Sequence, residues 1–239
     1  MLRPAALPCA FLLLAAASPP HVPILARDLI VNETTPALVY TWRVAPEAAL
    51  QPALFVRLHA EALESLATTR AEAIRDRKAS GFTQPYSSMT DWTLSYDGPR
   101  LIALVAQESR FTGGAHPNTG YRGLIWDKAA QRKIAFVDVF TDWANARPLL
   151  QRAACEALGV MRKTRRQGAV LGGDFDQCPP LDQATLVPFG DYGALRVIYS
   201  PYVAGPYAEG VYDLKLAWPA GVARFVRPQY RAGLFKAGN

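Results

Sequence analysis

The stretch Phe-Thr-Gly-Gly-Ala-His-Pro-Asn-Thr-Gly-Tyr-Arg, residues 111–122, determines how the rest of the chain is interpreted. Apolar runs at 101–106 and 121–126 stand on either side of it, and both are typical of strands. Its three glycines, its proline and its asparagine allow the backbone to turn sharply and to present N–H groups. The segment therefore either cradles an anion or simply connects two neighbouring strands.

Four strand-like runs surround this connection, at 91–96, 100–107, 121–126 and 133–136. The first two flank Asp97-Gly98-Pro99, which is a tight-turn signal. The runs follow one another too closely for helical crossovers. They therefore predict a meander of antiparallel strands.

Further strands and two helices flank this series. They are predicted as strands at 24–31 and 37–44, a helix at 50–78, a helix after Asp142 with Pro148 in its first turn, and strands at 185–189, 195–200 and 211–218. The order ββα–ββββ–α–βββ predicts an α+β fold of antiparallel sheets, with two main helices packed on one face. We expect an N-terminal lobe at 22–112 and a C-terminal lobe at 113–239.

Both helices show an apolar stripe at steps of three and four residues. The stripes consist of Phe55, Leu58, Ala62, Leu66, Thr69 and Ala73 in the first helix, and of Leu150, Ala154, Ala157 and Met161 in the second. The basic run Arg162–Arg166 stands where the second helix ends. It indicates a favourable interaction with the helix dipole, or attraction to anionic wall polymers or lipid headgroups.

The first eighteen residues are typical of a signal peptide. Arg3 precedes an apolar run at 10–17, and small residues lead to a cleavage site near Ser18. Nothing later is apolar and long enough for a transmembrane helix, so none is expected in the mature chain. We therefore expect a soluble protein that is periplasmic or secreted.

The predicted export determines which oxidation state we expect for the cysteines. Removal of Cys9 with the leader leaves Cys155 and Cys178, an even number in an oxidising compartment, which favours a disulfide over a free catalytic thiol. Between them, Asp174 and Asp176 offer two carboxylates where calcium takes about six to eight oxygens. No metal site is predicted.

The remaining motifs argue against several function classes. A net charge of +6 is spread along the chain without a recognition motif, so no nucleic-acid partner is expected. No phosphate-binding loop or Gly-x-Ser-x-Gly motif occurs, and no cofactor is predicted. His116 is the credible general base of a hydrolase, with Glu108, Asp127 or Asp138 as its partner, but a histidine in a glycine-rich turn more often orders that turn. No catalytic residue is assigned.

Three segments together resemble a domain of unknown function in exported bacterial proteins. They are Phe-Thr-Gly-Gly-Ala-His at 111–116, Trp126-Asp127 followed by Asp138-Val139-Phe140, and Tyr-Ser-Pro-Tyr-Val-Ala-Gly-Pro-Tyr at 199–207. Domains of this kind form the extracytoplasmic part of an anti-sigma-V lysozyme receptor and accompany a polysaccharide deacetylase domain in a cell-wall enzyme. The resemblance implies an exported, mostly non-catalytic binding or sensing module.

The function predicted from the sequence is recognition at the cell envelope. The partner is either an envelope protein, such as a lysozyme-like one, or peptidoglycan or another glycan. Candidate binding residues are His116, Asn118, Tyr121, Tyr202 and Tyr207, because aromatic side chains on turn-rich loops supply rigid contact area. Tyr202 and Tyr207 have the alternative role of packing the sheet edge. The alternative function is a cell-wall polysaccharide hydrolase or deacetylase-type enzyme that uses His116.

Overall fold

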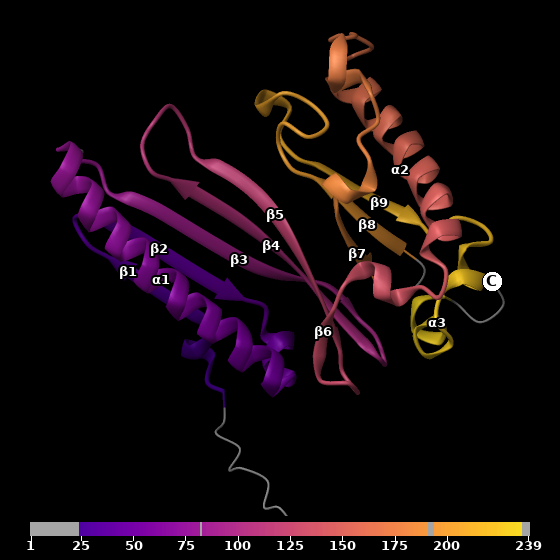
Figure 1. The fold of residues 1–239 in the computed structure, drawn as a ribbon, viewed down its shortest axis with the longest axis horizontal. Helices are drawn as coiled ribbons and strands as arrows, with labels where there is room; N and C mark the ends of the chain where they lie inside the picture. The colour runs from indigo at the N-terminus through magenta and orange to yellow at the C-terminus, as the bar shows by residue number, and fades with distance from the viewer. Residues whose placement is uncertain (1–23, 82, 191–193, 236–239) are drawn as a thin grey trace, which may run out of the picture.

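The computed structural model describes residues 24–81, 83–190 and 194–235 (Figure 1). The predicted leader at 1–18, with its cleavage site near Ser18, lies outside these residues. Within them the chain forms nine strands and three α-helices. The strands are β1 (Ile30–Thr34), β2 (Leu38–Val44), β3 (Tyr86–Asp97), β4 (Leu101–Phe111), β5 (Asn118–Asp127), β6 (Arg132–Ile134), β7 (Thr185–Phe189), β8 (Ala194–Tyr199) and β9 (Tyr212–Ala217). The helices are α1 (Pro52–Ser80), α2 (Trp143–Arg165) and α3 (Pro228–Leu234).

The predicted α+β class and element order are confirmed. Strands β1 to β6 form one sheet in chain order, and β7 to β9 form a second, antiparallel sheet. The predicted antiparallel meander corresponds to β3 to β6. One pair departs from the expected antiparallel sheets, since β2 and β3 are parallel. The reason is that α1 lies between them in the chain and carries it back to the start of the sheet.

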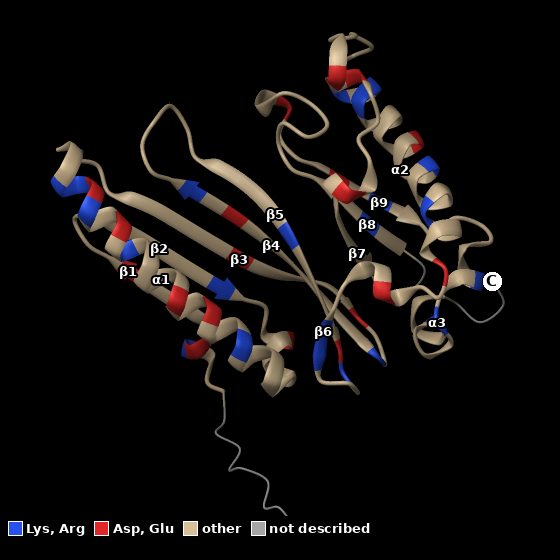
Figure 2. Ribbon diagram, in the orientation of Figure 1, with Lys and Arg blue, Asp and Glu red and all other residues tan. Residues whose placement is uncertain are grey.

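Helix α1 packs on one face of the six-stranded sheet, and we call these elements the first lobe. Its buried residues repeat the predicted stripe and add Leu54. They pack against alternate residues of the strands, among them Trp42, Trp92 and Leu104, in one apolar core. Acidic and basic residues are interspersed along α1 (Figure 2).

Helix α2 packs on the three-stranded sheet, and these elements, with α3, form the second lobe. The two main helices do not share one face as expected, because each sheet carries one of them, and α1 and α2 lie on the outer sides of the two sheets (Figure 1). The second core joins α2, the three-stranded sheet and the face of the first sheet opposite to α1. Strand β4 is buried on both faces, since Leu101 and Ala103 belong to the second core while Ile102 and Leu104 belong to the first.

The two lobes meet closely where β7 crosses β5. A Cβ atom built on Gly123 of β5 would lie 2.8 Å from a methyl carbon of Val187, so this position has no room for a side chain. Tyr230 of α3 donates a hydrogen bond of 2.8 Å to buried Asp127 at the end of β5. The six-stranded sheet also runs across the expected lobe boundary at residue 112, because β5 and β6 continue it beyond β4.

The expected disulfide is present. Cys155 of α2 and Cys178 of the following loop are joined, with their Cα atoms 5.5 Å apart. None of the helices in the described part of the chain is both long and apolar enough to cross a membrane.

Candidate functional site

Two loops that lie about ninety positions apart in the sequence meet at one end of the molecule. His116, in the β4–β5 connection, stacks on Tyr207 with ring centroids 4.0 Å apart and 18° between the ring planes. The Tyr207 hydroxyl donates a hydrogen bond of 2.8 Å to the Pro117 carbonyl. Tyr202 lies beside Tyr207, with 5.5 Å between the ring centroids. We call His116, Pro117, Tyr202 and Tyr207 the aromatic clasp.

The first arm of the clasp is the β4–β5 connection, and its backbone turns at two glycines. Gly113 and Gly114 have φ angles of 105° and 103°, a region that favours glycine over residues with a Cβ atom. The His116 ring then turns back on its own chain, with Nδ1 2.9 Å from the Pro117 carbonyl oxygen. His116 and Pro117 are both exposed. The glycine-rich segment is thus a connection between β4 and β5 that presents an imidazole ring at its tip.

The second arm of the clasp is the loop between β8 and β9, and it carries an aromatic residue in a strained conformation. Tyr202 has a φ angle of 72°, which is rare for a bulky residue, and its exposed fraction is 57%. A conformation of this kind costs about 1–3 kcal/mol and persists where the surrounding structure imposes it. The surroundings here are the buried residues Ala204 and Gly205, which anchor the middle of the loop. The exposed ring is therefore held in place by its backbone.

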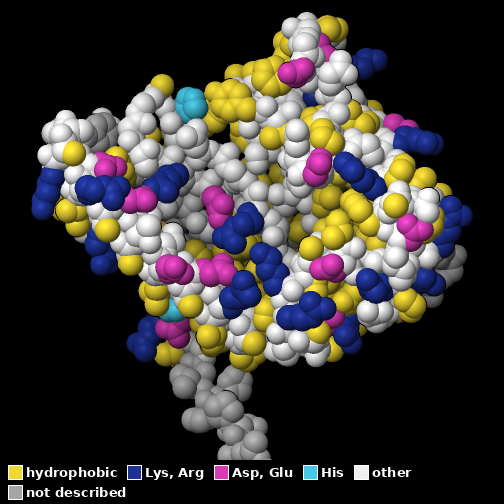
Figure 3. Space-filling model, in the orientation of Figure 1, with side chains coloured by type: hydrophobic (Ala, Val, Ile, Leu, Met, Phe, Trp, Pro, Cys, Tyr) yellow, Lys and Arg dark blue, Asp and Glu magenta, His cyan; other side chains and the backbone are white. Residues whose placement is uncertain are grey.

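The base of the clasp is formed by hydrogen bonds to the edge of β5. Ser200, just after β8, accepts a bond of 3.2 Å from the Tyr121 N–H, and Thr185 of β7 donates one of 2.8 Å to the Tyr121 carbonyl. Figure 3 shows the surface between the lobes hollowed below the place where a histidine side chain meets side chains of the hydrophobic class. Most of this hollow is formed by polar side chains and backbone.

A buried arginine anchors the second arm to α2. Arg162 donates to the Ala204 carbonyl through Nε and Nη2, at 3.0 and 2.6 Å, and to the Gln177 carbonyl through Nη1 at 2.9 Å. Burial and then the neighbouring charge of Arg166 lower the pKa of its guanidinium. One side chain therefore ties the clasp loop and the disulfide loop to the same helix.

A second arginine completes this network one turn later. Arg166 is paired with Glu209 through Nε at 2.8 Å and with Asp176 through Nη1 at 2.7 Å, and its side chain is 5% exposed. The hydrogen bond from Arg166 lowers the pKa of the Glu209 carboxyl although burial opposes its ionisation. The basic run therefore does more than interact favourably with the helix dipole. Arg162 and Arg166, four residues apart, continue the buried side of α2.

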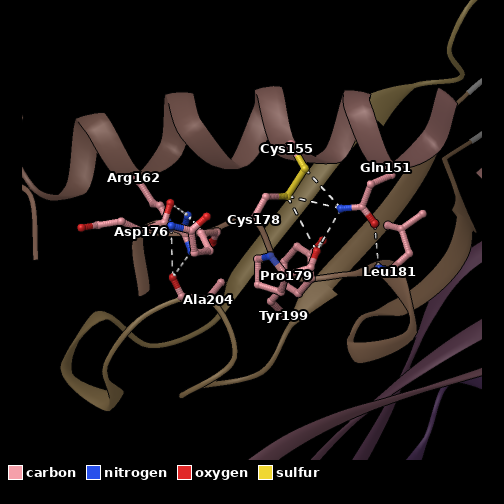
Figure 4. Close-up of a disulfide and its surroundings, with 10 residues drawn as sticks. Gln151, Cys155, Arg162, Asp176, Cys178, Pro179, Leu181, Tyr199 and Ala204 are labelled. Carbon is pink, nitrogen blue, oxygen red and sulfur yellow. Dashed lines mark hydrogen bonds between the residues drawn. A yellow bond between two sulfur atoms is a disulfide. The ribbon is translucent and has the colours of Figure 1, made fainter. Parts of the chain in front are cut away.

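The disulfide adds a covalent tie to the same region (Figure 4). One turn before Cys155, the Gln151 side chain donates a hydrogen bond of 3.0 Å to the Pro179 carbonyl and accepts one of 3.0 Å from the Leu181 N–H. The Tyr199 hydroxyl donates to the same Pro179 carbonyl at 3.2 Å, and burial raises the pKa of Tyr199 to about 12. The loop after α2 is therefore fixed from both sides of the disulfide.

The structure brings together three of the five candidate binding residues. His116, Tyr202 and Tyr207 form the clasp, and Asn118 is exposed at the start of β5 beside it. Tyr121 has a different place, since its side chain packs against the second core and its backbone binds Ser200 and Thr185. Burial raises the pKa of its hydroxyl, and the charge of Asp213 raises it further.

The carboxylates considered as partners of His116 have other contacts. Glu108 is paired with Arg122 at 2.9 Å, and Asp138 accepts a hydrogen bond from the Ala135 N–H. Asp127 is paired with Arg100 at 2.7 Å. The described residues contain no cluster of three or more His, Cys, Asp or Glu side chains that could hold a metal ion.

Sequence reasoning missed the residues that hold the clasp closed and in place. Pro117, Ser200 and Thr185 act through a backbone carbonyl and two small hydroxyls, for which a single sequence has no signal. Arg162 and Arg166 did leave a signal. Their four-residue spacing continues the stripe of Leu150 and Ala154, so the pattern itself places them on the buried side of the helix.

Comparison with known proteins adds a family segment and a fold. The family model described as Deacetylase PdaC matches residues 47–119, which run from before α1 through the first arm of the clasp to the start of β5. No curated protein matches the chain. A crystal structure of a DUF3298 family protein from Pseudomonas aeruginosa PAO1 is 17% identical, with a TM-score of 0.51, and the match covers 80% of this chain and 85% of that one.

A member of the same family from Bacteroides fragilis NCTC 9343 is also 17% identical, with a TM-score of 0.49 and coverage of 79% and 88%. The likeness to the Pseudomonas protein shows a shared fold. With the match to the PdaC model, it supports a domain of the DUF3298/PdaC type.

Proposed function

We propose that this protein is an exported, non-catalytic recognition module of the cell envelope, which binds a glycan or a protein at the aromatic clasp. The observation that carries the proposal is the stacking of His116 on Tyr207 beside Tyr202, three side chains contributed by two distant loops. Aromatic rings of this kind supply large, rigid contact area at little cost in conformational entropy.

The strain at Tyr202 supports the same proposal. Its left-handed backbone keeps a largely exposed ring on the surface, where it buries little area. Strained residues cluster at functional sites, because the surrounding structure has to maintain them. The network of Arg162 and Arg166 supplies that support here. A role for Tyr202 in packing the sheet edge would require a buried ring.

Export is supported by three further observations. The disulfide between Cys155 and Cys178 suits an oxidising compartment, and residues 1–18 have the pattern of a signal peptide. The PdaC-type segment and the fold of a DUF3298 family protein favour an envelope-associated domain. The anti-sigma-V lysozyme receptor suggested by the sequence resemblance makes a lysozyme-like protein one partner to test.

The binding test uses the purified oxidised chain in two assays. One is co-sedimentation with peptidoglycan sacculi, and the other is pull-down of envelope proteins and of lysozyme. We expect retention in one of them, and at least a tenfold loss for the double variant Y202A/Y207A, since hot-spot aromatics dominate binding. The matched control is V160A, which truncates a 69% exposed apolar side chain on α2. Equal retention of all three proteins, or no retention in either assay, would contradict the proposal.

The enzymatic alternative rests on His116 alone. Within the described part of the chain His116 contacts the Pro117 carbonyl and the Tyr207 ring, and neither is an acid or base partner. A deacetylase or glycan hydrolase assay on the wild type and on H116A tests this alternative directly. Activity that H116A abolishes without loss of folding would replace the recognition proposal with an enzymatic one.

A further inference from the structure

The free edge of β5 has a regular pattern of backbone groups. In an antiparallel ladder, successive residues direct their N–H and C=O groups alternately to one neighbouring strand and to the other. The bonds of Tyr121 to Ser200 and Thr185 show that Tyr121 is directed away from β4. The N–H and C=O groups of Thr119, two residues earlier, are therefore directed to the same side, toward the second arm of the clasp.

The neighbouring groups on this edge already have partners. On one side of Thr119 the Pro117 carbonyl accepts from Tyr207, and on the other side the Tyr121 N–H and carbonyl are bound by Ser200 and Thr185. No residue of the described part of the chain is bonded to the backbone of Thr119 on this side, and Thr119 is partly exposed. Because this edge of Thr119 is partly exposed, its N–H and carbonyl are accessible to water or to a ligand. The clasp thus frames one free donor and one free acceptor.

We propose that this frame binds an N-acetylated amino sugar of a glycan chain, with the acetamido carbonyl accepting from the Thr119 N–H and a sugar hydroxyl donating to the Thr119 carbonyl. The sugar ring lies against the Tyr207 and Tyr202 rings, which offer apolar faces beside the polar edge. Asn118 is exposed next to Thr119 and adds an uncharged amide to the site. This inference rests on the proposed function and names its ligand class.

An extended peptide fits the frame less well than a sugar does. Pairing of a further strand with β5 would need the backbone groups of every second residue along the edge to be free. Those of Tyr121 and the carbonyl of Pro117 are occupied, so the free edge is one residue long. A ligand with one strong acceptor and a neighbouring donor meets this requirement, and N-acetylglucosamine carries both.

The experiment titrates the oxidised protein with N-acetylglucosamine tetramer and, as the matched ligand without acetamido groups, with cellotetraose. Binding is measured by calorimetry and by the amide shifts in two-dimensional NMR. The variant T119P removes the free N–H without removing a ladder bond, because proline is tolerated at an edge strand whose N–H faces outward. The control T119V keeps the N–H and removes only the hydroxyl.

We expect the Thr119 amide signal to move on titration with the tetramer. T119P should weaken binding by about tenfold or more and T119V by less than about twofold, as expected for the loss of one buried hydrogen bond. Cellotetraose should bind about tenfold more weakly or not at all. The NMR shift in the wild type provides this test even if T119P folds poorly.

Three results would overturn the inference. Cellotetraose binding as tightly as the acetylated tetramer would show that the acetamido group is not recognised. An unchanged Thr119 amide, together with loss of tetramer binding in Y207A, would leave recognition at the clasp intact and remove Thr119 from it. An extended peptide that moves the Thr119 amide when the tetramer does not would assign the frame to a peptide. Failure of the proposed function would give a different result, because Y207A and Y202A/Y207A would then leave binding unchanged.

Discussion

The two lobes share one plan, a helix on a sheet, but different interactions hold them together. In the first lobe, α1 packs through an unbroken apolar stripe that includes Phe55 and Leu58. In the second lobe, the apolar stripe of α2 ends in Arg162, and the loops beyond it are held by ion pairs, carbonyl contacts and a disulfide. The ion pairs of Arg166 are buried, whereas those of Arg57 and Arg70 on α1 lie at the surface.

This difference follows from what each lobe has to position. A helix and long strands bury periodic apolar faces, and hydrophobic burial is the main interaction that fixes them. The loop at 200–210 has no such face, so its conformational entropy is opposed by bonds of defined geometry. The first lobe is therefore the scaffold of the aromatic clasp, and the second lobe fixes the loop that carries Tyr202 and Tyr207.

Removal of Arg166 should have the largest effect on stability, and this effect should be confined to the second lobe. We expect R166A to reduce the free energy of unfolding by about 3–5 kcal/mol, because Glu209 and Asp176 lose their partner while partly buried. Hydrogen exchange should increase in 170–178 and 200–210 and stay unchanged in α1. Chemical denaturation and exchange mass spectrometry measure both effects.

The matched control in the first lobe is R70A, which removes the exposed pair of Arg70 with Glu33. Its expected effect on the free energy of unfolding is small, since exposed surface ion pairs contribute little to stability. If R166A were as mild as R70A, the buried network would not be what holds the second arm. R166K, which keeps the charge and loses the planar fork, should lie between the two variants.

The disulfide gives the second test. The C155S/C178S variant should lose about 3 kcal/mol, because a cross-link across a separation of 23 residues restricts the unfolded chain. The first lobe should retain its exchange protection, while the loop after α2 and the clasp loop lose theirs. Uniform loss of protection in both lobes would show that the disulfide stabilises the molecule as one unit. The reduced wild type serves as the control for the serine side chains.

The same contrast explains which features could be predicted from the sequence. The stripe of α1 was predicted residue by residue, since periodicity within one element reports the burial of that element. For α2, Leu150 and Ala154 are buried as predicted, but Ala157 and Met161 are only partly buried, while Leu158 and Arg162 are buried. An apolar criterion cannot include an arginine whose partners are carbonyls elsewhere in the chain.

Long-range features were the least predictable. The parallel pairing of β2 with β3 depends on where α1 returns the chain, which strand patterns do not contain. The sequence singles out the segments at 111–122 and 199–207, but it does not contain the information that they meet. Their contact depends on the Pro117 carbonyl and on the Ser200 hydroxyl, groups whose partners are set by the tertiary fold.

Asp127, at the junction between the lobes, should make the stability of the fold depend on pH. Burial opposes the ionisation of Asp127, but hydrogen bonds from the Ala130 N–H, Tyr230 and Arg100 lower the pKa of its carboxyl below the ordinary value of 3.8. A carboxyl with a lowered folded-state pKa stabilises the fold above its unfolded pKa. This contribution is lost as the pH falls through the lower, folded value.

We therefore expect the stability of the wild type to fall below about pH 4, and the difference between wild type and D127N to shrink over the same interval. Asp176 and Glu209 also have lowered pKa values and remain in both proteins, so the difference isolates Asp127. Denaturation curves from pH 3 to pH 7 measure it. A constant difference across that range would exclude the junction carboxylate as the source of the acid sensitivity.

The smallest expected effect concerns the polar contact between α1 and its sheet. The Tyr40 hydroxyl, buried under α1, donates a hydrogen bond of 2.9 Å to the Ala62 carbonyl, which as a helix residue also has its own backbone partner. Y40F should therefore cost about 1 kcal/mol, because no acceptor is left unpaired. L58A, which truncates a fully buried side chain of the same helix, should cost about 2–5 kcal/mol. Equilibrium denaturation of the two variants compares them directly. If Y40F cost as much as L58A, the first lobe would depend on a directional contact as the second does, and the distinction between the lobes would be lost.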